Sequence, residues 1–145
     1  MKVSPKGISL IKEFEGRLLH AYHDIAGVLT IGYGHTGPDV HIGQIITEED
    51  AEALLVKDLE RFERCVSAAV TVPVEQHQFD AMVALAYNIG CSAFTESTFV
   101  RRLNEGATPE HASQAWLWWN RAGGRVIPGL VRRRKAEVDL FLGVA

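Results

Sequence analysis

The segment 74–89 is apolar on nearly every side of the helix that its residues favour, which leaves it no stable place on a protein surface. Its apolar residues include Phe79, Met82, Val83, Leu85 and Ala86. We therefore expect a central, buried helix that begins after the break at Val72-Pro73 and ends at Gly90. A chain of 145 residues with 47% apolar residues can surround such a helix with one core of ordinary size.

Two further helices precede this segment. The first begins at Ser4-Pro5, with Ser4 as its cap and Pro5 at its first position, and Gly16 disturbs it. The second runs from Thr47, its cap, to about Ala69, with Asp50 in a weaker version of the capping-box position. One apolar stripe follows this long helix through Ala51, Leu54, Leu55, Leu59, Phe62 and Val66.

Shorter helices are predicted in the C-terminal part of the chain, over 95–105, 109–119 and 130–142. Gly106 and Gly143 end the first and the last of them, and Thr108-Pro109 opens the second. Asn120 to Pro128 is predicted as a Gly-rich loop.

Residues 20–36 change to the pattern of short strands joined by a turn at Ile25-Ala26-Gly27. The predicted fold class is therefore α+β, mostly helical, with one small N-terminal antiparallel sheet. We expect a single domain over 1–145. A sheet lobe (about 17–46) would be joined by the long helix (about 47–69) to a helical lobe (about 70–145) that includes the N-terminal helix.

The segment from Glu15 to His35 contains the candidate catalytic residues. Glu15 stands where the first helix stops, Asp24 follows on a short strand-like run, and Thr30 lies on the next run before Gly32-Tyr33-Gly34-His35. Each alone is more often an end-of-helix acid, a turn residue or a strand hydroxyl. Together they supply two carboxylates in different environments, as general acid/base chemistry on a glycoside requires.

The order and spacing of these residues resemble the phage-type lysozymes, or endolysins, of glycoside hydrolase family 24. The family signature is Glu, eight residues, Asp or Cys, five residues and Thr, and Glu15, Asp24 and Thr30 match it. Segments 46–52, 87–90, 93–97 and 122–134 are similar to lambdoid and T-even phage lysozymes, so the resemblance covers nearly the whole chain and is weakest at 98–118.

The resemblance implies a lysozyme-like fold and hydrolysis of the β-1,4 bond between N-acetylmuramic acid and N-acetylglucosamine in peptidoglycan. Glu15 would be the general acid, while Asp24 and Thr30 would activate a water in an inverting mechanism. Tyr87, Asn88 and Ser97 would bind substrate, and either Arg132 or Arg133 would approach Glu15. No metal ion or organic cofactor is implied.

Two alternatives stay open. A lytic transglycosylase breaks the same bond without water and can work with Glu15 alone, although Asp24 and Thr30 argue against it. A non-catalytic wall-binding module could keep the fold, although the intact Glu15, Asp24 and Thr30 argue against that as well.

Three other groups of residues have structural interpretations. The family pattern suggests a structural ion pair between His35 and Asp58, and the spacing of histidines and acids favours no metal site. Trp116 and Trp119 have the helical spacing of core residues, and Trp118 points elsewhere. Cys65 and Cys91 are expected as small apolar residues, with a disulfide left open.

The net charge and the hydropathy of the chain argue against two kinds of partner, nucleic acids and membranes. A net charge of −3 argues against bulk nucleic-acid binding, although residues 91–145 carry 8 Lys+Arg against 5 Asp+Glu. The chain has no run of 18 apolar residues, so no membrane-spanning helix is expected. The N-terminus enters the first helix almost at once and lacks an apolar stretch, so no export signal is expected there. The resemblance implies a monomer made in the host cytoplasm that acts on peptidoglycan in the periplasm, with a holin-type protein for release.

Overall fold

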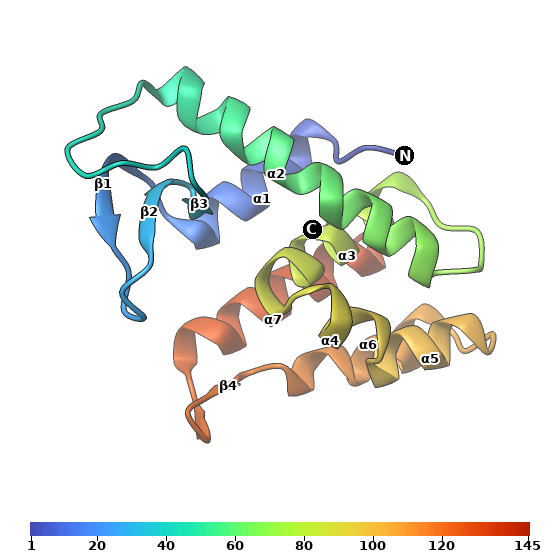
Figure 1. Ribbon diagram of the computed structural model, residues 1–145. Helices are drawn as coiled ribbons and strands as arrows, with labels where there is room; N and C mark the ends of the chain where they lie inside the picture. The colour runs from blue at the N-terminus through green and yellow to red at the C-terminus, as the bar shows by residue number, and fades with distance from the viewer.

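The computed structural model describes all 145 residues, and the all-round apolar segment forms α3 (Gln76–Ile89) at the centre of the fold. Every residue from Phe79 to Ala86 is buried. Around α3 pack α1 (Pro5–Glu15), α2 (Glu48–Ala69) and α7 (Pro128–Leu142), as Figure 1 shows. The expectation of a central helix is confirmed.

The capped, one-sided helix predicted from Thr47 forms α2. Thr47 Oγ1 accepts a hydrogen bond from the Asp50 N–H at 3.1 Å, and Asp50 Oδ2 accepts one from the Thr47 N–H at 3.1 Å. Both orphan donors of the first turn are thereby satisfied. The predicted stripe is buried at Ala51, Leu55, Leu59, Phe62 and Val66, so α2 packs on both the sheet and α3.

The N-terminal sheet is antiparallel, in the order β1 (Leu18–His23), β2 (Leu29–Gly32) and β3 (His35–Thr36). In Figure 1 it lies at one end of α2, which runs from the sheet toward the other helices. The predicted fold class, α+β and mostly helical with a small antiparallel sheet, is confirmed.

A buried polar contact fixes the start of α1 against α3. Asp80 is buried and accepts hydrogen bonds from the Ser4 N–H at 2.9 Å, from the Ser4 hydroxyl and from Gln76 Nε2 at 2.7 Å. Gly7 lies directly on Asp80, since a Cβ at Gly7 would stand 2.8 Å from the Asp80 Cβ. This contact sets the position of α1, and therefore of Glu15 at its other end.

Three predictions for the C-terminal part need correction. The helix predicted over 95–105 begins later, as α5 (Thr98–Asn104), and a short helix that was not predicted, α4 (Cys91–Thr95), precedes it. The helix over 109–119 ends early as α6 (Pro109–Gln114) and continues as the 3₁₀ turn η1 (Trp116–Trp118). The loop after it forms a hairpin of β4 (Arg121–Ala122) and β5 (Arg125–Val126).

The early end of α6 also determines which tryptophan side chains are buried. Trp116 is fully buried against Phe99 and Phe141, as predicted. Trp119 is 36% exposed rather than in the core, because the 3₁₀ turn removes the α-helical spacing that would place it beside Trp116. Trp118 is 60% exposed and lies near the Arg102 guanidinium.

Cys65 and Cys91 are free and half-buried. No helix has the length and apolarity that crossing a membrane requires.

Candidate active site

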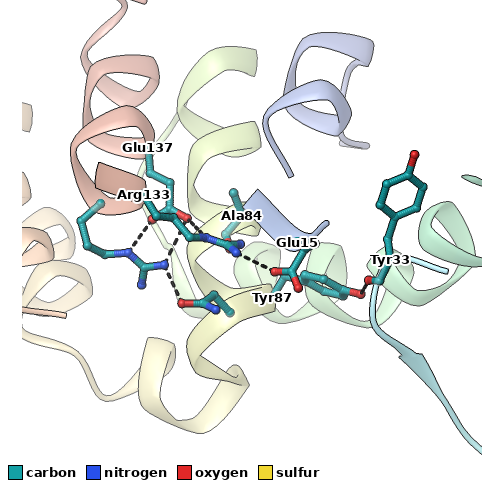
Figure 2. Close-up of polar contacts among 8 residues, drawn as sticks. Glu15, Tyr33, Ala84, Tyr87, Arg133 and Glu137 are labelled. Atoms are coloured by element: carbon teal, nitrogen blue, oxygen red, sulfur yellow. Dashed lines mark hydrogen bonds and ion pairs between the residues drawn. The ribbon is translucent and has the colours of Figure 1, made fainter. Parts of the chain in front are cut away.

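Glu15 is the last residue of α1, and its two carboxylate oxygens have different surroundings. Oε2 accepts a hydrogen bond from Arg133 Nη1 at 2.6 Å, as Figure 2 shows. Oε1 faces Gly34, where a Cβ would stand 3.5 Å from it. The side chain is 18% exposed. One oxygen is therefore held by an arginine, and the other borders open space.

The turn between β2 and β3 forms the other wall of this space. Gly34 adopts a φ of 86°, which other residues rarely adopt, and a Cβ there would also stand 3.8 Å from Tyr87 Oη. Tyr87 donates a hydrogen bond to the Tyr33 carbonyl at 2.9 Å. Burial, with the nearby charge of Glu15, raises the pKa of Tyr87 well above its usual range, so its hydroxyl keeps its proton.

A cleft of about 500 Å³ opens beside Glu15. The β2–β3 turn contributes Gly34 to its lining, and β3 contributes Thr36. Asp58 and Phe62 come from α2, and Tyr87 comes from α3. Polar groups form most of this lining, as suits a hydrophilic polymer better than an apolar ligand.

Arg133, which holds Glu15, is itself held by a buried carboxylate. Its Nε donates to Glu137 Oε2 at 2.9 Å and its Nη2 to the Ala84 carbonyl at 3.2 Å. Glu137 also accepts from Trp116 Nε1 at 3.1 Å and lies 3.0 Å from Arg134 Nε. With Glu15 included, two buried arginines face two carboxylates, so the charges balance.

This cluster sets the protonation states around Glu15. Burial alone would lower the pKa of Arg133, but the charges of Glu137 and Glu15 outweigh burial and hold that pKa above its usual value. Burial raises the pKa of the Glu137 carboxyl, against the opposing effect of both arginines. Arg133 therefore stays charged and presents a fixed donor to Glu15.

Sequence reasoning left the choice between Arg132 and Arg133 open and did not identify Glu137. The structure places Arg133 on Glu15, while Arg132 is exposed. The sequence did contain a signal for both residues. Arg133 and Glu137 lie four residues apart, on the same buried face of α7 as Leu140 and Phe141, and this spacing favours an ion pair.

Asp24 and Thr30 both bind the backbone of Val28 in the β1–β2 turn. Asp24 Oδ1 accepts hydrogen bonds from the Ala26 N–H at 2.9 Å and from the Val28 N–H at 2.8 Å. The buried Thr30 hydroxyl donates to the Val28 carbonyl at 2.9 Å. One carboxylate oxygen of Asp24 thus organises the turn, and Oδ2 has no partner in the protein. Neither residue lines the cleft described above.

His35 joins the sheet to α2. Its Nδ1 lies 2.7 Å from Asp58 Oδ2, the contact that the family resemblance implied, and its Nε2 lies 2.9 Å from Asp39 Oδ2. Burial would lower the pKa of His35, but the hydrogen bonds that its ring donates to Asp58 and Asp39 hold that pKa above its usual value. Asp39 was not anticipated from the sequence.

The three predicted substrate-binding residues have different surroundings. Tyr87 lines the cleft. Asn88 is exposed, and its Oδ1 accepts from Arg134 Nη2 at 2.6 Å. The placement of Ser97 corrects the prediction, because Ser97 is only 5% exposed and its hydroxyl bonds the Phe94 carbonyl and the Val100 N–H. Ser97 caps α5, and this use of its side chain removes it from the cleft.

In a comparison with known protein families, residues 12–137 match the family described as "Phage lysozyme". Among known proteins, the endolysin of Bacillus phage B103 is 46% identical over 144 residues, which cover 98% of this chain and 54% of the phage protein. The chain spans about half of the length of the Bacillus phage endolysins that it matches.

Solved structures show the same similarity. The endolysin from Escherichia coli O157:H7 phage FAHEc1 is 42% identical, with a TM-score of 0.92 over 100% of this chain and 96% of that chain. The muramidase domain of SpmX from Asticaccaulis excentricus is 42% identical, with a TM-score of 0.90 over 97% of each chain.

Proposed function

The chain belongs to the phage lysozyme family, and from this premise we propose that it hydrolyses the β-1,4 bond between N-acetylmuramic acid and N-acetylglucosamine in peptidoglycan. The observation that carries the proposal is the arrangement of Glu15, with one oxygen held by Arg133 and the other beside a polar cleft. The similarity to a Bacillus phage endolysin and to the muramidase domain of SpmX supports it.

Glu15 is the proposed general acid. Its Oε1 borders the space beside Gly34, so a glycosidic oxygen there could receive its proton. The bond from Arg133 to Oε2 fixes the orientation of the carboxyl group, and a fixed donor needs little reorganisation as the bond breaks.

Asp24 and Thr30 are the proposed water-activating residues. Asp24 keeps one oxygen free of protein partners, and the Thr30 hydroxyl binds the carbonyl of Val28, the residue whose N–H binds Asp24. A water held there would attack the opposite face of the sugar and invert the anomeric centre. Tyr87, in the cleft, and Asn88, beside Arg134, are proposed to contact the glycan. These steps use side chains and water alone.

We also propose the biological setting that the family resemblance implies. The sheet would act as one lobe and α1 with α3 to α7 as another, with α2 between them and the glycan strand in the cleft. The protein would act as a monomer on the wall in the periplasm, after release from the host cytoplasm by a holin-type protein.

Three measurements on purified walls test the activity. Wild-type protein should clear a suspension of wall fragments, and the Glu15→Gln variant should not. The products should carry free reducing ends at the mass of hydrolysed muropeptides. Products lighter by one water would instead show anhydro ends and a lytic transglycosylase, and binding without clearing would show a non-catalytic wall-binding module.

A further inference from the structure

Three cations on α2 line the cleft that reaches Glu15. Lys57, Arg61 and Arg64 follow one another at intervals of four and three residues, which places them along one face of the helix. All three side chains are exposed. We call these residues the basic stripe.

The basic stripe is not neutralised within the protein. Of the carboxylates that line the same cleft, Glu15 pairs with Arg133 and Asp58 with His35, which leaves Glu60. No carboxylate oxygen lies within ion-pair distance of Lys57, Arg61 or Arg64. Only the carboxylate of Glu60 therefore remains in the cleft to offset the three cations of the stripe, although the whole chain carries −3.

One member of the stripe has a defined orientation. The Arg61 guanidinium lies 4.7 Å from the centre of the Phe62 ring, and Phe62 lines the cleft as well. A cation over an aromatic ring is held in place without losing its charge, so its hydrogen-bond donors stay available. Such a group can accept a carboxylate with little loss of side-chain freedom.

The proposed substrate has one kind of negatively charged group that could bind the basic stripe. The acetylated sugars of peptidoglycan are uncharged along the glycan, but the muramic acid residues carry short peptides with free carboxylates. We propose that the basic stripe is a subsite for the stem-peptide carboxylates of the strand being cleaved. This proposal rests on the proposed function, because it assumes a peptidoglycan strand beside Glu15.

The test compares two forms of one substrate. Short, uncross-linked glycan strands that carry free stem peptides are assayed before and after their carboxylates are converted to amides. The variant Lys57→Gln/Arg61→Gln/Arg64→Gln should show a KM about tenfold higher than wild type on the acidic strands, since three exposed charge contacts each contribute a small factor. Its kcat should change little, and the two proteins should be alike on the amidated strands.

Two further variants sharpen the comparison. Arg101→Gln/Lys6→Gln/Lys135→Gln removes three positive charges from exposed residues outside the cleft and should keep the wild-type KM, which separates a subsite from general attraction. Glu60→Gln removes the remaining unpaired carboxylate of the cleft and should lower the KM on acidic strands. Melting temperatures of all variants should stay near wild type.

Each other outcome overturns the subsite. An equal rise in KM on acidic and amidated strands would show that the stripe contacts the sugars. An equal effect of the control variant would show unspecific attraction to an anionic polymer. No effect of the stripe variant would show that the peptides lie elsewhere. If wild-type protein cleaves neither substrate, the proposed function itself fails, which is a distinct result.

Discussion

At the scale of single residues, the two carboxylate oxygens of Glu15 have different environments. Oε2 is bound by Arg133, and Oε1 faces the cleft beside Gly34. A carboxyl group with one oxygen fixed can place its proton reproducibly, and a neighbouring glycine lets the backbone approach without covering it.

Replacing Glu15 by Gln should therefore abolish lysis and preserve the fold. The amide oxygen can still accept the hydrogen bond from Arg133, but the amide cannot donate a proton as an acid does. We expect wall clearing to fall by roughly 10²–10⁴-fold, the range of general acid/base catalysis. Turbidity measures the rate and circular dichroism the fold. A Gln variant that clears walls near the wild-type rate would remove Glu15 from the role of acid.

Asp24 needs a substitution that spares the turn. Asp24→Asn keeps an acceptor for the Ala26 and Val28 N–H groups while it removes the charge. Thr30→Val removes the hydroxyl and keeps the volume. Both should lower kcat more than they raise KM, because the water that we propose they activate matters only as the bond breaks. Steady-state kinetics on soluble glycan strands measures the two constants, and a change confined to KM would assign both residues to substrate positioning.

At the scale of elements, the buried cluster on α7 joins α7 to α1 and to η1. Glu137 bonds Arg133 and Trp116, and Arg133 in turn bonds Glu15 at the end of α1. The cluster is therefore both a packing contact and the support of the proposed acid.

Glu137→Gln should destabilise the protein strongly. It leaves two buried arginines with one carboxylate fewer, and breaking a buried ion pair from one side costs about 3–5 kcal/mol. Urea denaturation measures the loss of unfolding free energy. Lys135→Gln, which breaks the exposed pair with Asp139, is the matched control and should cost less than about 1 kcal/mol. Equal effects of the two variants would contradict a stabilising role for the buried cluster.

His35 links the sheet to α2 in a manner that depends on pH. Its pKa is raised in the folded protein, so its contribution to stability is present below about pH 6.5, the usual unfolded value, and is lost as pH rises through the folded pKa. The melting temperature of wild type should exceed that of His35→Gln most at about pH 5.5–6.5, and the difference should shrink toward pH 9. A difference that grows with pH would contradict the charged pair, and lost activity in a variant that melts normally would make His35 catalytic.

At the scale of the whole molecule, the proposed mechanism requires the sheet and the helices to face each other across the substrate. Glu15 comes from α1, and Asp24 from the turn of the sheet that α2 covers. An inverting enzyme needs room for a water between its second carboxylate and the anomeric carbon, which sets its two carboxyl groups roughly 6.5–9.5 Å apart.

The first product from the β-linked glycan should therefore be the α-anomer. Proton NMR recorded before mutarotation distinguishes the two anomers, and free reducing ends should accumulate with it. A β-anomer as first product would make Asp24 a nucleophile or would move the attacking water to the other face. Anhydro sugar would replace hydrolysis by the transglycosylase reaction.

Local features of the sequence determined the main helices and the motif. The apolar surface of α3, the Thr47 capping box with its stripe, and the order of Glu15, Asp24 and Thr30 are all set within a few turns of chain. Helical periodicity and capping are short-range properties, because they depend on neighbours three or four residues away, so one sequence suffices to predict them.

Only the tertiary structure decided which distant groups meet. Arg133 reaches Glu15 across 118 residues, and Glu137 is buried only because two arginines and Trp116 surround it. The exposure of Trp119, the use of Ser97 as a cap and the unpaired basic stripe likewise depend on where elements end and pack. Burial and pairing of charges are properties of the whole packed chain, since a partner's position fixes whether a charge is stabilised or excluded.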